Sequence, residues 1–187
     1  RDQLLFSLGD LKGKKILEVG AGMGGDSVYL AKQGAFVTAL DYTDEALSAI
    51  REHAKKENVE LSVKQGDTNQ LPFNDESFDV VFHQGLLEHF RDPLVILKEH
   101  ARVLRKGGYL AVDVPQTFTT YTIKKKIAIA RGTWFAGWER AFSIGQLENI
   151  LRASSLTVVK SYGWGYYGKL HALRNLKLGD WYESLWR

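Results

Sequence analysis

Hydrophobic positions follow two alternating patterns along the first 114 residues of the chain. Short apolar runs, typical of buried strands, occupy residues 14–20, 35–41, 59–65, 78–83 and 108–114. Between them, apolar residues recur every three or four positions, as in helices that bury one face, over residues 25–34, 43–57 and 92–104. This alternation predicts an α/β fold with a doubly wound, mostly parallel sheet and helices on both faces.

Local signals mark where the elements begin and end. Gly34 is predicted to end one helix in a left-handed conformation, and Thr43 to be the N-cap of the next. Pro93 is predicted to lie in the first turn of a third helix. After Pro115 the periodicity weakens through a stretch rich in aromatic residues and lysines, at 116–142. Beyond it we predict a helix, a strand and a further short helix, over residues 143–154, 156–162 and 170–176. Since no repeat or linker is evident, we expect one domain over residues 1–187.

Composition narrows the class of protein. The chain is 44% hydrophobic and 25% charged, as ordinary globular domains are. Its 25 Lys and Arg against 22 Asp and Glu give a net charge of only +3, which does not indicate nucleic-acid binding. The absence of cysteine excludes disulfides, zinc thiolate sites and thiol nucleophiles. Without a long apolar run or a signal-peptide pattern, we expect a cytoplasmic protein, and peripheral membrane contact stays open.

Four glycines follow the first predicted strand, in the segment ILEVGAGMGGDS at residues 16–27. In doubly wound sheets, ligands bind beyond the carboxyl ends of the strands, and glycines let the backbone approach them closely. Gly20, Gly22 and Gly25 match the dinucleotide-binding spacing G-x-G-x-x-G. This spacing alone leaves a nicotinamide or flavin cofactor open.

The charges around these glycines separate the candidate ligands. Glu18 precedes the turn and Asp26 follows it, so a pyrophosphate there would meet two negative charges. No Lys or Arg lies between Lys15 and Lys32 to offset them. Carboxylates also stand at the end of the second predicted strand, at Asp41, and after the third, at Asp67. The residues therefore favour a ligand that is cationic or that offers hydroxyl and amine groups.

Five segments, taken in order, resemble the class I S-adenosylmethionine-dependent methyltransferases, particularly the small single-domain members of the methyltransferase-11 type. They run from about residue 14 to residue 115, as ILEVGAGMGGDS, ALDYTDEAL, QGDTNQLPF, FDVVFHQGLLEHFRDP and VLRKGGYLAVDVP. The resemblance implies a Rossmann-like fold and S-adenosylmethionine as the cofactor. This cofactor carries a sulfonium and an ammonium against one carboxylate and no phosphate, in agreement with the charges.

The resemblance also implies a set of cofactor-binding residues. Around the methionine part and the sulfonium it places Glu18 and the backbone of Gly20, Gly22, Gly24, His83 and Gln84. Around the adenosine part it places Asp41 on the ribose hydroxyls, Tyr42 on the adenine ring, and Asp67 and Thr68 on the adenine edge. Two local alternatives stay open, namely Asp41 as a cap of the next helix and Asp67 as a turn residue.

Methyl transfer needs a base only when the acceptor arrives protonated, as an alcohol or a phenol does. His89, just past the fourth predicted strand, is the best placed candidate for a catalytic base, and His83 is second. The alternative for His89 is an orienting role at a helix start. Glu88 and His89 are adjacent and so point in different directions on a helix, and with no third ligand evident we predict no metal site.

The resemblance assigns acceptor binding to segments inserted after the fifth strand, here residues 116–142, as a cap. Lys124, Lys125, Lys126 and Arg131 lie there among aromatic residues. We favour lysines solvated on an amphipathic cover helix; the alternative is an anionic acceptor, such as a phosphorylated or carboxylated metabolite or a lipid-linked sugar.

The functional prediction is therefore an S-adenosylmethionine-dependent methyltransferase. No N/D-P-P-Y/F segment, typical of enzymes that methylate amino groups of DNA bases, follows the fourth strand, which favours a small-molecule acceptor over nucleic acid. Two alternatives are an NAD(P)- or FAD-dependent oxidoreductase and a cofactor-binding subunit without catalytic activity. The oligomeric state is not predicted.

Overall fold

The computed structural model describes residues 9–117, 119–135 and 137–161. Its elements are β1 (Lys15–Val19), α2 (Gly25–Lys32), β2 (Phe36–Asp41), α3 (Asp44–Lys56), β3 (Ser62–Gln65), β4 (Phe78–Gln84), the 3-10 helix η1 (Leu87–His89), α4 (Pro93–Val103), β5 (Leu104–Asp113), α5 (Thr120–Ala130) and α6 (Ile144–Ala153). The helices predicted at 25–34, 43–57, 92–104 and 143–154 are confirmed, with boundaries that differ by at most two residues.

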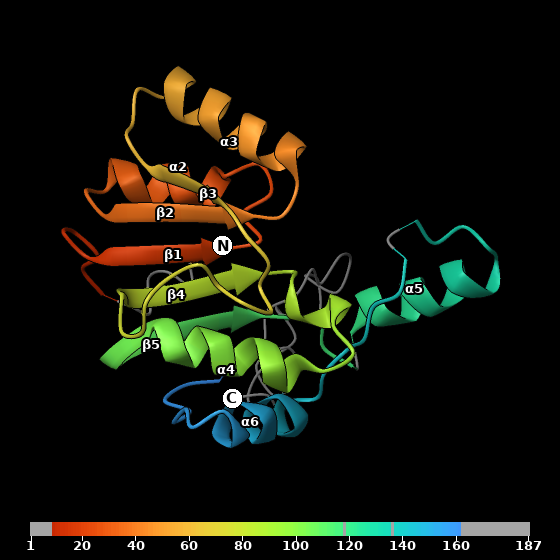
Figure 1. Cartoon of the computed structure of the whole chain (residues 1–187). Helices are drawn as coiled ribbons and strands as arrows, with labels where there is room; N and C mark the ends of the chain where they lie inside the picture. Colours follow the sequence, from red (N-terminus) through yellow and green to blue (C-terminus); the bar gives the residue numbers. More distant parts are fainter. Residues whose placement is uncertain (1–8, 118, 136, 162–187) are drawn as a thin grey trace, which may run out of the picture. The chain divides into compact units, whose positions relative to one another are not determined.

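Five parallel strands form one sheet in the order β3, β2, β1, β4, β5 (Figure 1). Helices α2 and α3 pack against β2 and β3, whereas α4 packs against β5 on the opposite face from α2 (Figure 1). The chain begins in the middle of the sheet, moves outward to β3 and returns to β4 on the other side of β1. The strand order therefore reverses between β1 and β4, and their carboxyl ends flank the place where doubly wound sheets bind ligands.

The two central strands are buried on both faces. Ile16 and Leu17 of β1 and Phe82 of β4 are fully buried. A strand covered on both sides has no solvent face, which explains the near-continuous apolar runs in the sequence. This core fixes the two strands whose ends carry Glu18 and His83.

Two strands, β3 and β5, begin more than one residue away from their predicted starts. β3 begins at Ser62, three residues late, because the N–H of Val59 still bonds the carbonyl of Ala54 at the end of α3 (3.0 Å). β5 begins at Leu104, four residues early, directly after α4. Its pairing with β4 passes through an irregular register, which the left-handed Gly107 (φ +72°) accommodates.

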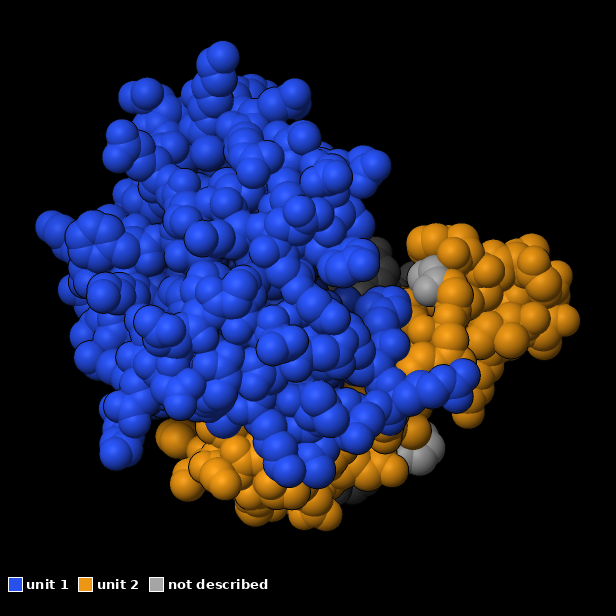
Figure 2. Space-filling view, in the orientation of Figure 1, with its two compact units in different colours: residues 1–114 blue, residues 115–187 orange. Residues whose placement is uncertain are grey.

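The residues after Val114 belong to a second compact unit, coloured separately in Figure 2. Within it, Pro115 accepts the N–H of Phe142 (2.9 Å), and Gln116 pairs with Phe142 in a parallel bridge. The two ends of the 116–142 segment are therefore held together, so the segment forms a closed loop that begins and ends side by side.

The strand predicted over residues 156–162 is wrong for its described part. Leu156 donates its N–H to Leu151 at the end of α6 (3.2 Å), and residues 157–161 pair with no strand among the described residues. A segment that meets no partner strand forms no ladder. Residue 162 and the helix predicted at 170–176 lie outside the described residues. Among the helices that the structure describes, none combines the length and the apolar character needed to cross a membrane.

Candidate functional site

The turn after β1 has the backbone conformation that favours glycine. Gly20, Gly22 and Gly24 have φ angles of +70°, +54° and +69°, where other residues are strained. An added Cβ at Gly20 or Gly24 would lie 2.9 Å from a neighbouring side-chain carbon, whereas one at Gly22 would meet no atom within 4 Å. Gly22 therefore borders open space, where a ligand can approach the backbone.

Asp41 joins this turn to the end of β2. Its Oδ2 accepts the N–H of Gly22 (2.9 Å), and its Oδ1 accepts the N–H groups of Tyr42 and Thr43 (2.8 and 3.1 Å). The N-cap of α3 is Thr43, whose hydroxyl accepts the N–H of Ala46. The helix-cap interpretation of Asp41 is therefore wrong, and its carboxylate is instead held beside the glycine turn.

A hollow of about 450 Å³ lies at the ends of β2 and β3. Its lining consists of Tyr42, Thr43, Asp44, Glu45, Gln65, Gly66 and Asp67. Three of these residues are acidic and none is basic, so the hollow disfavours phosphate and suits hydroxyl and amine donors. The side chain of Tyr42 is exposed and its ring is accessible to a ligand in the hollow.

Glu18 places a second carboxylate at the end of β1. Its side chain is buried and accepts a hydrogen bond from the hydroxyl of Ser27 in α2. Asp26, in the first turn of the same helix, is also buried. Negative charge is therefore fixed on both sides of the glycine turn, as the sequence predicts.

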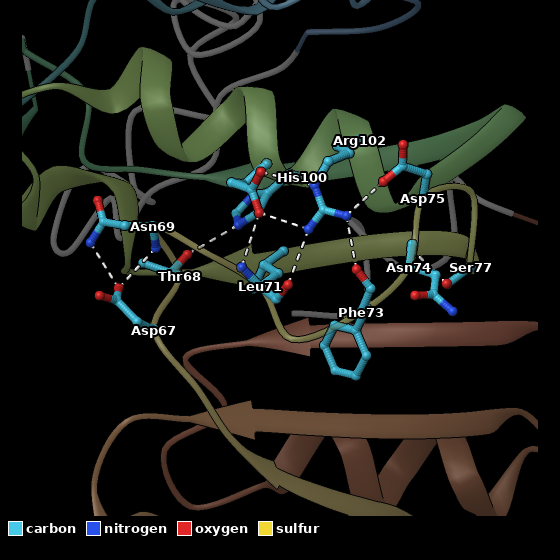
Figure 3. A network of polar contacts seen from close by, with 11 residues as sticks. Asp67, Thr68, Asn69, Leu71, Phe73, Asn74, Asp75, Ser77, His100 and Arg102 are labelled. Atoms are coloured by element: carbon cyan, nitrogen blue, oxygen red, sulfur yellow. Dashed lines mark hydrogen bonds and ion pairs between the residues drawn. The ribbon is translucent and has the colours of Figure 1, made fainter.

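The loop after β3 is built around a local turn (Figure 3). Asp67 Oδ1 accepts the backbone and side-chain N–H groups of Asn69 (both 2.8 Å), which confirms the turn interpretation. The neighbouring Thr68 is buried, and its hydroxyl lies 3.2 Å from Nε2 of His100 in α4. Binding of an adenine edge by Asp67 and Thr68 stays a prediction.

Helix α4 holds this loop through Glu99, which accepts the N–H of Leu71, and through His100 and Arg102 (Figure 3). We call these three residues the α4 clamp. Arg102 makes five hydrogen bonds of 2.8 to 3.0 Å, two of them to Glu99 and the others to the carboxylate of Asp75 and the carbonyls of Leu71 and Phe73. These five bonds match the five N–H donors of a guanidinium. Hydrogen bonds with Glu99 and Asp75 raise the pKa of Arg102, and the bond from Arg102 lowers the pKa of Glu99, so both groups stay charged.

The α4 clamp was missed from the sequence, although His100 carried a signal. It occupies an apolar position in the helical periodicity, and its neighbours on that face, Ile96, Leu97 and Val103, are fully buried, as His100 is. A polar residue at such a position needs a partner inside the protein. The partner, Thr68, could not be inferred because it lies 32 residues away.

His83 is fully buried at the end of β4. Its ring centroid lies 5.2 Å from that of His100, and neither of its ring nitrogens has a hydrogen-bond partner among the described residues. Burial, with a further contribution from His100, lowers the pKa of His83 well below its usual value. A buried neutral ring does not reach an acceptor, so His83 is unsuitable as a base, while cofactor binding by the His83 and Gln84 backbone stays a prediction.

His89 ends the 3-10 helix η1, just past β4. Its side chain is exposed, whereas the adjacent Glu88 is buried, so the two point in different directions as expected. Within the described ranges, no three His, Cys, Asp or Glu side chains gather as a metal site would require. The exposed position leaves His89 accessible to a bound acceptor, and its role as a base stays a prediction.

The lysines of α5 differ from the expectation that all of them are solvated. Lys124 and Lys126 are exposed, but Lys125 is buried and pairs with Glu139 (Nζ to Oε2 2.7 Å). Its ammonium also lies 5.3 Å from the centre of the Trp134 ring. Lys125 therefore has a structural role and does not contribute to a surface for an anionic acceptor.

Comparison with known proteins assigns the chain to a family. The sequence model of the family described as "Methyltransferase domain" matches residues 17–112. Ubiquinone biosynthesis O-methyltransferases from Coxiella burnetii and Aliivibrio fischeri are 35% and 37% identical to the chain over 100 and 108 residues. These matches cover 54% and 57% of this chain but 43% and 46% of those proteins, so the chain spans less than half the length of these relatives.

A solved structure shares the fold over most of the chain. It is a SAM-dependent methyltransferase from Aquifex aeolicus, which superimposes with a TM-score of 0.68 at 22% identity. The superposition covers 88% of this chain and 83% of that one. At this identity the likeness concerns the arrangement of the strands and helices.

Proposed function

Because the chain belongs to the class I S-adenosylmethionine-dependent methyltransferases, we propose that the site described above binds S-adenosylmethionine and that the protein transfers its methyl group to a small-molecule acceptor. The main support is the set of carboxylates at the ends of β1, β2 and β3, beside the open backbone of Gly22. A sulfonium and an adenine amine fit such a lining, whereas a pyrophosphate would be repelled.

Bound S-adenosylmethionine supplies a methyl group that its sulfonium already activates. The residues of the chain then have to align two molecules and exclude water, and alignment can contribute on the order of 7 to 11 kcal/mol. In this proposal Glu18 keeps negative charge near the methionine part, Asp41 accepts from the ribose hydroxyls, and Asp67 accepts from the adenine amine. Gly22 allows the close approach.

We further propose a hydroxyl as the methyl-accepting group. The relatives from Coxiella burnetii and Aliivibrio fischeri are named O-methyltransferases, and exposed His89 lies where β4 ends. A hydroxyl must lose its proton during transfer, which gives His89 a role as base. An anionic or lipid-linked acceptor within this class is part of the proposal, because the exposed charge of the 116–142 segment is positive.

Titration calorimetry of the whole chain tests the cofactor. We expect S-adenosylmethionine and S-adenosylhomocysteine to bind and NAD not to bind. Asp41→Asn should weaken binding about ten-fold or more, since hydrogen bonds to charged groups contribute about 1.5 to 3 kcal/mol. Glu52→Gln, which neutralises an exposed carboxylate on α3, is the matched control. Binding of NAD without a response to S-adenosylmethionine would overturn the proposal.

Turnover needs a separate test, because binding alone also fits a cofactor-binding subunit. The chain is incubated with radiolabelled S-adenosylmethionine and a panel of hydroxylated small molecules, with the Asp41→Asn variant alongside. Label in a product, reduced in the variant, supports methyl transfer. Cofactor binding without any labelled product from the panel or from a metabolite extract would contradict it.

A further inference from the structure

Large apolar side chains are exposed along α5 and in the loop that follows it, and two of them, Ile123 and Ile127, share one face of the helix. The exposed fractions of Ile123, Ile127, Ile129 and Phe135 are 60%, 47%, 53% and 91%. Single exposed apolar residues are common on protein surfaces, but a group of large ones marks a surface that something else covers. The family match ends at residue 112, so this group lies beyond the part of the chain that the family model matches.

Helix α5 exposes apolar residues on one face and buries polar residues on the other. Residues four apart lie on one face of a helix, so Ile123 and Ile127 form an exposed apolar stripe, while Thr122 and Lys125 are buried on the other side. At about 100° per residue, Lys124 borders the stripe on one flank and Lys126 on the other. Arg131, seven residues after Lys124, extends the first flank.

The hairpin made by α5 and residues 131–139 is held together from within. Tyr121 packs edge to face against Trp134 (6.1 Å between centroids), and Lys125 donates to the carbonyl and the carboxylate of Glu139 (3.1 and 2.7 Å). The carbonyl of Gly137 accepts the indole N–H of Trp134 (3.0 Å). On α5 these contacts involve Tyr121 and Lys125, so Ile123 and Ile127 take no part in them.

The exposed charge of this hairpin is entirely positive. Glu139 is the only acidic residue between 116 and 142, and its side chain is 5% exposed and neutralised by buried Lys125. Lys124, Lys126 and Arg131 stay exposed. A surface of apolar side chains bordered by cations is complementary to a bilayer that carries anionic lipids, with the cations at the headgroups.

We propose that the exposed face of α5 forms a docking surface for an anionic lipid bilayer. Ile123 and Ile127 enter the boundary between headgroups and acyl chains, and Lys124, Lys126 and Arg131 contact the lipid phosphates. The contact is peripheral and involves one face of one helix. It goes beyond methyl transfer and does not depend on which acceptor the protein uses.

Vesicle cosedimentation of the whole chain tests this proposal. We expect binding to vesicles of phosphatidylcholine with phosphatidylglycerol, little binding to phosphatidylcholine alone, and weaker binding as salt is added. Replacing both exposed lysines (Lys124→Gln with Lys126→Gln) should lower partitioning about 25-fold, since each cation near such a surface contributes about five-fold. Replacing Ile123→Gln with Ile127→Gln should lower it by on the order of ten-fold or more.

A matched control removes the same charge from the first unit. Lys55→Gln with Lys56→Gln neutralises two adjacent exposed lysines on α3 and should leave partitioning nearly unchanged. Circular dichroism checks folding, and titration of S-adenosylmethionine should give the same affinity in all three variants. Equal binding to both vesicle types, or an equal loss in the control, overturns the proposal. So does a dimer in sedimentation velocity that the isoleucine variant dissociates, because a second copy would then cover the face.

Discussion

Asp41 is fixed before any ligand arrives, because three backbone N–H groups already hold its carboxylate. A charge that is oriented in advance needs no rearrangement on binding. Its position at the end of β2 could be predicted from the sequence, since it follows directly on an apolar run. Its bond to Gly22 could not be predicted, because the two residues lie 19 positions apart and meet only when β1 and β2 pair.

His89 is the proposed base, which only an acceptor with a hydroxyl group requires. His89→Gln should lower kcat for a phenol or alcohol about 100-fold or more, since general-base catalysis contributes about 10² to 10⁴. The KM for S-adenosylmethionine should stay the same. Steady-state kinetics across pH give a second readout, because a phenolic acceptor that is already ionised needs no base and should rescue the variant. An equal loss at all pH values would point to an orienting role.

The buried histidines make folding sensitive to acid. Burial, with a contribution from His100, lowers the pKa of His83 well below 6.5, and burial lowers the pKa of His100 to about 4 against the opposing effect of Glu99. Below pH 6.5 the unfolded chain therefore binds protons that the folded chain does not bind. Stability is present above pH 6.5 and is lost as the pH falls towards 4, by up to ~1.4 kcal/mol per pH unit for each histidine.

Urea unfolding between pH 7 and pH 5 measures this loss. His83→Leu removes one of the two groups and should reduce the slope of unfolding free energy against pH by up to ~1.4 kcal/mol per unit. The slope is the decisive quantity, because the substitution also changes packing and so shifts the free energy at every pH. Identical slopes in the two proteins would show that His83 does not stay neutral in the fold.

At the scale of elements, the helices could be predicted better than the strands. Thr43 and Ser143 cap α3 and α6 through residues three positions away, so the signals for these ends are local. A strand depends on its neighbour instead. The sequence predicted a strand over residues 156–162, yet residues 156–161 meet no partner strand among the described residues. In contrast, β5 pairs with β4 from Leu104 onward, across Gly107 and Gly108.

The α4 clamp gives a prediction at the same scale. Arg102→Lys keeps the charge but removes the planar fork that binds Glu99, Asp75 and two carbonyls. We expect the free energy of unfolding to fall by about 2 kcal/mol and hydrogen exchange to quicken over residues 67–77. Arg105→Lys is the control, since it alters a single ion pair with Asp79 in which the arginine is half exposed, and such a pair contributes about 1 kcal/mol or less. Equal effects of the two substitutions would contradict a clamp.

Across the whole molecule, the candidate site could be predicted where the same kind of residue recurs at successive strand ends. A carboxylate or a glycine stands at each successive strand end from β1 to β3, and residues 17–112 match one family model. After Val114 no such spacing exists. Lys125 and Glu139 meet across 14 residues of irregular sequence, and nothing local distinguishes this buried lysine from its two exposed neighbours. Which lysines of α5 are exposed therefore depends on contacts between distant residues and could not be predicted from the sequence.

Binding of S-adenosylmethionine should stabilise the two compact units unequally, because every proposed contact lies between Glu18 and His89. At about 100 times its Kd, a ligand stabilises the fold that binds it by ~2.7 kcal/mol. Hydrogen exchange followed by mass spectrometry should then slow over residues 18–27, 41–45 and 67–71, and change little over residues 143–161. NAD at the same concentration should alter neither region. Protection confined to residues 115–161 would place the cofactor elsewhere and remove the carboxylates of β1, β2 and β3 from its recognition.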